Sequence, residues 1–463
     1  MRDLFTTIGT RYLIAILNLA LIFINAKVLG VEGVGLVGLI LAIVGIATMF
    51  CGILAGNTIV YFMNRYSMQA VFLPSYCWTP AGAGIACGSM AILGVLPEGH
   101  ALDIYILSTL TSLVAANSRF LLGKNQIFGF NLTFVLQGGL LFFVLLFLYY
   151  GLKIQNVTAY LWGMYFTNGI AFLVSLFLLL PFLNKKEADP RKGRSQYALL
   201  KEMFAYGLWG SADNIAEILT TRLNYFLIQR FAGLGSVGLL DAGTKISESV
   251  WHINRSIGFI TYSRVARTHK PGEQKQITLR FFKLTFCAIT LATGCILLIP
   301  EWIYTDYLFS AEFVGMHNVI TGLSAGIIAL ACNSILCQYF TGSGKIRYST
   351  GSSFVGLISL LVSGYLLIPH YGVFGSAISS SIAFSTMLAF SMIIFCRKTG
   401  TRPKDFLINK EDVRFALRKL WLTHDDDTCY IRRDAPPVSL NAPFRQSSHG
   451  AGFSFVFSFQ SWK

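Results

Sequence analysis

Apolar stretches of about twenty residues follow one another along this chain as far as about Cys396. A helix needs about 20 predominantly apolar residues to cross a hydrocarbon layer of about 30 Å. A hydrophobic content of 54%, with 13% charged residues and a mean hydropathy of +0.59, is also too apolar for a soluble fold of this length. We therefore predict about twelve membrane spans. They lie near residues 12–29, 36–63, 71–96, 101–122, 127–151, 157–183, 206–229, 236–262, 284–302, 313–340, 348–369 and 373–396.

Basic residues alternate between the connections that join these spans. The odd-numbered connections contain only Lys27, Lys153 and Arg230. The even-numbered connections carry Arg65, Arg119, Lys124, Lys185, Lys186, Arg191, Lys192, Arg194, Lys201, Arg264, Arg267, Lys270, Lys275, Arg280, Lys283, Lys345 and Arg347. Because basic loops stay in the cytoplasm, we predict an all-α integral membrane protein with cytoplasmic N- and C-termini. The net charge of +15 then reflects membrane orientation and not nucleic-acid binding.

The longest hydrophilic connection divides the apolar part of the chain nearly in half. We predict an N-terminal six-helix bundle (1–183), a basic cytoplasmic linker (184–205), a C-terminal six-helix bundle (206–396) and a cytoplasmic tail (397–463) that forms a short helix and then loses order.

A short motif recurs in the two predicted bundles. One copy is Lys27-Val-Leu-Gly30-Val-Glu-Gly-Val-Gly35-Leu, and the other is Arg230-Phe-Ala-Gly233-Leu-Gly-Ser-Val-Gly238-Leu. Six spans separate the copies, which favours a parallel pseudo-repeat whose two bundles enclose a central cavity. Chance is the alternative, because glycine-rich turns are common in helical membrane proteins.

Five ionisable residues form a stripe in the span at 236–262. Asp241, Lys245, Glu248, His252 and Arg255 are spaced 4, 3, 4 and 3 residues apart. On a helix they fall within an arc of about 80° and rise about 21 Å along the axis. Because charged side chains are costly in lipid, we predict that the stripe faces a water-filled cavity or another polar helix. The alternative is that Asp241 with Lys245, or Lys245 with Glu248, forms an intrahelical ion pair.

Two other spans offer polar partners for this stripe. In the span at 206–229, Asp213, Glu217, Thr220 and Asn224 share one face, and Arg222 lies nearly opposite. In the first span, Arg11, Asn18 and Asn25 recur every seven residues on one face. Arg11 also fits an interfacial anchor.

Motifs for catalysis or metal binding are not evident. Gly342-Ser-Gly-Lys345 lacks the spacing of a phosphate loop, and we find no hydrolase elbow, zinc-protease motif or C-x-x-C pattern. We predict a protein that is not an enzyme and that holds no cofactor. Coupling to a bound proton or sodium ion through the buried carboxylates remains open.

Three sequence segments carry a resemblance to a known family. They are the first turn ending Lys27-Val-Leu-Gly-Val-Glu-Gly-Val-Gly, the run Thr221-Arg222-Leu-Asn224-Tyr-Phe-Leu-Ile with Gly233 to Gly243, and Gln338-Tyr-Phe-Thr-Gly-Ser-Gly-Lys345 with Leu367 to Ala377. The chain resembles the polysaccharide-transporter branch, the O-antigen-type flippases, of the multidrug/oligosaccharidyl-lipid/polysaccharide exporter superfamily. Many relatives have an acid where this chain has Asn224, so a proton-binding role there is not expected.

The resemblance implies transport of oligosaccharide repeat units linked to undecaprenyl pyrophosphate. They would move from the cytoplasmic to the outer leaflet of a bacterial inner membrane as two six-helix bundles rock between inward- and outward-open states. A polysaccharide polymerase and glycosyltransferases of the same pathway are expected partners. A cation-coupled drug exporter of the same superfamily and an integral-membrane polymerase or acyltransferase are the alternatives.

We assign roles within this resemblance from the charge of each residue. Lys245, Arg255 and Arg222 are expected to meet the pyrophosphate, with Arg11 at the mouth of the cavity. Asn18 and Asn25 are expected to bind sugar hydroxyls. Charge pairing or ion coupling is expected from Asp213, Glu217, Asp241, Glu248 and His252.

Overall fold

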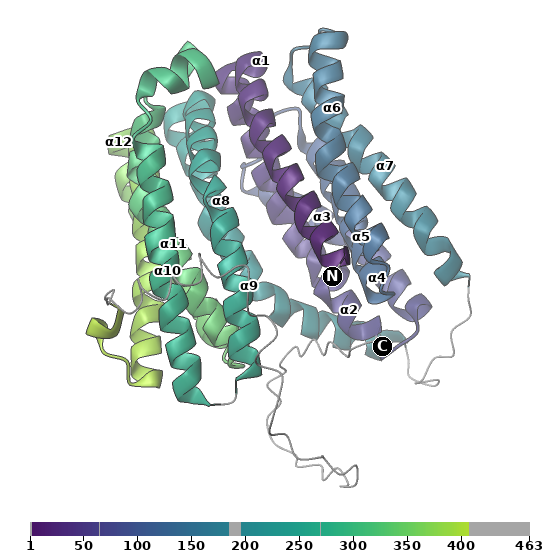
Figure 1. The fold of residues 1–463 in the computed structure, drawn as a ribbon. Helices are drawn as coiled ribbons and strands as arrows, with labels where there is room; N and C mark the ends of the chain where they lie inside the picture. The colour runs from purple at the N-terminus through teal and green to yellow at the C-terminus, as the bar shows by residue number, and fades with distance from the viewer. Residues whose placement is uncertain (1, 64, 185–195, 269, 407–463) are drawn as a thin grey trace.

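The computed structural model describes residues 2–63, 65–184, 196–268 and 270–406. The N-terminal half contains α1 (Arg2–Ala55), α2 (Asn57–Met63), α3 (Met68–Ile92), α4 (Ala101–Gly123), α5 (Ile127–Phe134), α6 (Leu140–Leu146) and α7 (Val157–Leu183). The C-terminal half contains α8 (Gln196–Ser249), α9 (Trp251–Arg267), α10 (Pro271–Leu297), α11 (Met316–Gly342) and α12 (Arg347–Thr399). Figure 1 shows the two halves as separate groups of helices, with α1 and α8 between them.

Short irregular helical segments complete the described chain. Two π-helical turns, Val135–Gly139 and Phe147–Gly151, continue α5 and α6 into one long rod. A third π-helical turn, Ile303–Leu308, and a 3-10 turn, Ala311–Phe313, join α10 to α11. A second 3-10 turn, Pro403–Phe406, follows α12.

Three helices are too long for a single crossing. α1, α8 and α12 contain 54, 54 and 53 residues, which is about 80 Å each against a hydrocarbon layer of about 30 Å. Each bends at one glycine with positive φ: Gly30 (69°), Gly233 (80°) and Gly372 (53°). Glycine reaches this backbone region without a Cβ clash. Where the sequence led us to expect loops, single-residue turns therefore join antiparallel helices.

Seven described helical segments are long and apolar enough to span a membrane, including Ile16–Met63 and Arg347–Thr399, which contain two of these bends. The regular elements of the described residues are all helical, and the chain is a multi-pass membrane protein. The count of twelve spans, the cytoplasmic termini and the division into two repeated bundles stay predictions.

α8 begins earlier than expected, because Gln196–Ala205 was predicted as linker and is helical. In this segment Leu199 and Met203 are buried while Tyr197 and Phe204 are exposed, so its apolar face packs inward. The rest of the predicted linker, residues 185–195, and the predicted tail helix and disordered end lie outside the described residues.

The two halves meet at the end of the molecule that contains Gly30, Gly233 and the connection between α10 and α11, here called the Gly30 end. A Cβ added to Gly35 would lie 2.1 Å from the carbonyl oxygen of Leu234, and one added to Gly238 would lie 1.9 Å from that of Val31. Gly35 and Gly238 occupy the same place in the recurring motif, as do Val31 and Leu234. The contact is therefore reciprocal, and only glycine allows main chain to approach main chain so closely.

Small and polar residues hold α11 and α12 together in the C-terminal half. Gly326 of α11 packs so closely on Ser381 of α12 that a Cβ would lie 2.6 Å from the serine Cα. Asn333 accepts hydrogen bonds from Ser352 (3.2 Å) and Ser391 (2.6 Å) of α12. Such contacts replace the hydrophobic effect, which gives little association between helices in lipid.

Candidate functional site

Five side chains of α8 form a continuous polar chain, here called the α8 network. The bend at Gly233 lays the two parts of α8 side by side, so that Arg222 and Tyr225 from the first part meet Asp241, Lys245 and Glu248 from the second. Lys245 Nζ lies 2.6 Å from Asp241 Oδ2, and Arg222 Nη2 lies 3.3 Å from Glu248 Oε2. The Tyr225 hydroxyl accepts from Arg222 Nη1 (2.8 Å) and donates to Asp241 Oδ1 (3.2 Å), which joins the two ion pairs.

The network is buried at its centre and accessible at its ends. Asp241 is 2% exposed, whereas the side chains of Lys245, Arg222 and Glu248 are 28%, 24% and 23% exposed. A buried carboxylate is stable only when it is paired and hydrogen-bonded, and Asp241 has both partners. The formal charges of the two cations and two acids cancel within the network.

The network lies at the boundary between the two halves. Gly38 of α1 packs on Asp241 so tightly that a Cβ would lie 2.8 Å from the carboxylate carbon. Asp241 comes eight residues after Gly233, which places it about 12 Å along the helix from the bend. Relative motion of the halves would therefore change the surroundings of the buried acid.

The structure shows which ion pairs the described residues of the stripe form. The intrahelical ion pair Asp241–Lys245, an alternative at the sequence level, is present. Glu248 pairs with Arg222 from the neighbouring part of α8. The side chains of Arg11, Asp213, His252 and Arg255 lie outside the described part of the structure.

Arg222 contacts the stripe through Glu248. This differs from our expectation, which was that the opposite face of the helix, with Thr220 and Asn224, would contact the stripe. Asn224 is buried and donates to the Ser376 carbonyl (2.9 Å) and to Ser380 Oγ (2.6 Å) of α12. Thr220 likewise reaches the Ser353 carbonyl of α12 (3.3 Å). This face holds α8 against α12, because the bend at Gly233 sets a rotation that the spacing of polar residues does not reveal.

Three other predicted residues are described by the structure, namely Asn18, Asn25 and Glu217. Asn25 is buried in the N-terminal half, where its Oδ1 accepts from the Tyr149 hydroxyl (3.0 Å). Asn18 is exposed on α1, and Glu217 is exposed on α8. Among the described polar residues of the first span, Asn25 therefore bonds within the N-terminal half and not to the α8 network.

Sequence reasoning missed Tyr225. A signal was available, because Tyr225 follows Arg222 by three residues and so shares its helical face. Sequence reasoning also missed a polar cluster inside the N-terminal half. There Asn168 Oδ1 accepts from Gln137 (2.8 Å), which sits in a π-helical turn, and from Thr111 (3.3 Å).

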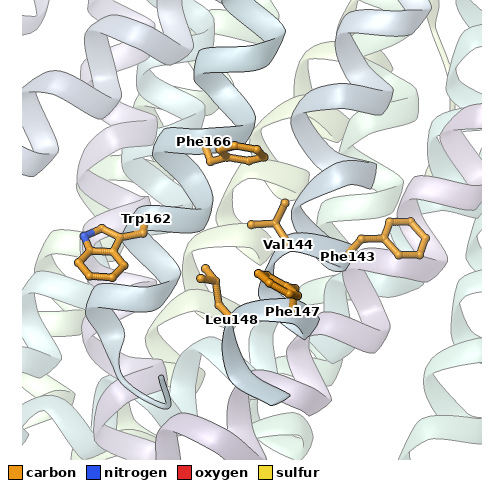
Figure 2. Close-up of a pocket in the computed structure, with 6 residues that line it drawn as sticks. All are labelled: Phe143, Val144, Phe147, Leu148, Trp162 and Phe166. Atoms are coloured by element: carbon orange, nitrogen blue, oxygen red, sulfur yellow. The ribbon is translucent and has the colours of Figure 1, made fainter. Parts of the chain in front are cut away.

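An apolar groove of about 440 Å³ opens between α6 and α7. Figure 2 shows its lining side chains, which are Phe143, Val144, Phe147, Leu148, Trp162 and Phe166. All six are apolar or aromatic, and Phe143, Phe147, Trp162 and Phe166 are exposed. Such a surface suits hydrocarbon and offers no charge to a polar headgroup.

Comparison with known proteins identifies the family. A sequence model of the polysaccharide biosynthesis protein family matches residues 1–253, more than half of the chain. The chain belongs to the polysaccharide biosynthesis protein family. The resemblance predicted from its glycine turns and polar helices is confirmed at the level of this family.

Individual relatives are distant. The chain is 21% identical to a putative O-antigen transporter of Shigella flexneri over 242 residues, which cover 51% of this chain and 55% of that protein. The matched segments span about half, or less, of the length of the curated relatives.

Two solved structures share the fold of this family member. An inward-facing multidrug resistance transporter of the MATE family has a TM-score of 0.70 and 15% identity, covering 84% of this chain and 94% of that one. The lipid II flippase MurJ in an inward closed conformation has a TM-score of 0.65 and 14% identity, covering 91% and 94%.

Proposed function

We propose that this chain moves lipid-linked oligosaccharides across a bacterial inner membrane, with undecaprenyl pyrophosphate as the lipid carrier. The α8 network is the observation that carries the proposal. Two partly exposed cations lie beside a seam between two halves of a polysaccharide transporter. A sugar–pyrophosphate headgroup needs such a route, since desolvating its charges in hydrocarbon costs many kcal/mol.

Lys245 and Arg222 are the proposed pyrophosphate contacts. Arginine binds phosphate oxygens through two parallel hydrogen bonds, and lysine binds them as a point charge. Asp241 and Glu248 hold these cations in the unloaded protein and give them up, in part, to the phosphate oxygens. Exchange of one anionic partner for another avoids leaving a cation unpaired in a low-dielectric site.

The remaining roles follow the same logic. From the sequence alone, we assign Arg255 as a further phosphate contact, Arg11 to the mouth of the cavity and Asn18 to the sugar hydroxyls, with charge pairing or ion coupling by Asp213, Glu217 and His252. Asn25, through its bond to Tyr149, supports the packing of α1. Glycosyltransferases that build the repeat unit and a polymerase that consumes it are the proposed pathway partners.

Display of surface polymer tests the proposal in a bacterium whose own O-antigen transporter has been deleted. We expect Lys245→Ala and Arg222→Ala each to lower display at least tenfold per molecule of transporter in the membrane, because each removes a phosphate contact worth about 1.5–3 kcal/mol. Lys404→Ala, at an exposed lysine beyond α12, is the matched control and keeps full display. Full display in both network variants would refute the proposed route.

A further inference from the structure

The connection between α10 and α11 crosses the seam at the Gly30 end. Tyr304, Phe309 and Phe313 of this connection are buried in an apolar cluster that also contains Ala26 and Val34 of α1 and residues of α8 and α11. The ring of Phe23 in α1 packs edge-on against Phe309, with 5.3 Å between centroids. A segment of the C-terminal half is thereby anchored on the first helix of the N-terminal half.

The same connection supplies a carboxylate to a helix start in the other half. Glu312 Oε2 accepts a hydrogen bond from the Val31 backbone N–H at 2.8 Å. Val31 is the first residue after the bend at Gly30, so its N–H has no acceptor within the new helix. A negative charge is also favoured at a helix N-terminus. Glu312 thus caps the second part of α1 from the opposite half of the chain.

Among the described residues, no carboxylate lies beside Gly233 as Glu312 lies beside Gly30. Gly30 and Gly233 have nearly the same backbone conformation, with φ/ψ of 69°/−178° and 80°/177°. A Cβ at Gly30 would lie 2.7 Å from Glu312 Oε2, whereas a Cβ at Gly233 would meet no atom within 4 Å. The motif is repeated, but the carboxylate approaches only the first copy.

We propose that Glu312 is a latch that holds the two halves together at the Gly30 end, and that its release from Val31 accompanies opening of that end. The aromatic anchors keep the connection on α1, and the Glu312–Val31 bond fixes where it rests. In the transport cycle, which rests on the proposed function, the latch would set how readily the Gly30 end opens to let cargo leave. The latch itself exists without cargo and is tested without it.

Hydrogen exchange of the full chain in lipid nanodiscs tests the bond. In Glu312→Gln and Glu312→Ala we expect the Val31 amide to exchange faster, by about fivefold in the alanine variant. A fivefold change is about 1 kcal/mol at tenfold per 1.4 kcal/mol, the usual effect of losing a helix N-cap. Glu98→Gln, at an exposed acid in the connection between α3 and α4 at the same end, is the control and leaves Val31 unchanged. Unchanged exchange in both Glu312 variants would overturn the proposal.

Opening is measured separately from the bond. Ala242 of α8 is fully buried in the cluster at the seam, and its small side chain makes Ala242→Cys a mild change. In an Ala242→Cys background we expect Glu312→Ala to speed labelling of residue 242 by a water-soluble maleimide severalfold, quantified on the peptide by mass spectrometry. Faster Val31 exchange without faster labelling would mean a local cap only, and would refute the latch.

The two equivalent glycines provide a matched pair of variants. Gly30→Ala and Gly233→Ala both force alanine toward positive φ, so both strain the backbone. Only Gly30→Ala also pushes against Glu312, and we expect faster labelling of residue 242 from it and not from Gly233→Ala. Equal effects of the two variants would contradict the latch. Because none of these measurements needs cargo, they decide the latch alone, and the display assays decide the proposed function alone.

Discussion

The Tyr225 hydroxyl is the atom on which the two ion pairs of α8 depend for their common geometry. It is the donor to a carboxylate that is almost fully buried, and it accepts from the guanidinium of Arg222. Removing this hydroxyl costs about 1–3 kcal/mol, because the buried Asp241 carboxylate loses a donor that it cannot replace with water.

We therefore expect Tyr225→Phe to lower the free energy of unfolding by about that amount. Thermal unfolding in detergent or nanodiscs measures it. Tyr150→Phe removes the hydroxyl of an exposed tyrosine and should leave the unfolding temperature unchanged. Equal unfolding temperatures for Tyr225→Phe and the parent would show that the hydroxyl does not bind the network together.

Two variants test whether Lys245 binds the cargo or only neutralises Asp241. Asp241→Asn leaves Lys245 without its counter-charge and is expected to destabilise the protein by about 3 kcal/mol. Adding Lys245→Met removes the unpaired charge and should restore much of the stability and abundance. If Lys245 meets the pyrophosphate, polymer display stays low in the double variant. Recovered display would instead make the pair structural.

At the scale of elements, the glycine bends decide which side chains meet. Apolar runs predicted the helices well, since a membrane span has a clear length and composition. The pairing of Arg222 with Glu248 was not predictable, because helical spacing orders residues within one helix and gives no rotation across the bend at Gly233. Burial of Asn224 against α12 escaped prediction for the same reason.

The close contacts of Gly35 and Gly238 predict that replacing Gly35 by alanine has an unusual effect on stability. An alanine in a helix normally stabilises relative to glycine by about 0.5–1 kcal/mol. At Gly35 the new methyl group would overlap the Leu234 carbonyl, so we expect Gly35→Ala to destabilise by about 1–3 kcal/mol. Gly52→Ala, on the same helix with nothing within 4 Å of the added carbon, should be neutral or stabilising. Thermal unfolding of the two variants checks this prediction. Similar unfolding temperatures would contradict the close contact between Gly35 and Leu234.

For the whole molecule, the charge balance of the network bears on the energy source. Its two cations and two acids cancel, so under the proposed function the charge that crosses the membrane is that of the cargo. Moving two negative charges outward through an inside-negative potential releases about 4.6 kcal/mol per 100 mV. We therefore expect the membrane potential to drive export, although the buried carboxylates keep proton or sodium antiport as the competing scheme.

Proteoliposomes loaded with lipid-linked oligosaccharide distinguish the two schemes. A potassium diffusion potential set with valinomycin should speed flipping, and collapsing a pH gradient with nigericin at zero potential should not slow it. Flipping that follows the pH gradient at zero potential would establish proton coupling. A sodium gradient that drives flipping at zero potential would point to sodium.

The seam at Gly35 and Gly238 is built from peptide groups, which every residue shares. Sequence drift in the surrounding side chains therefore leaves the joint itself untouched, provided the two glycines remain. Members of this family could therefore differ in the side chains around the joint and still keep the same main-chain contact between their halves.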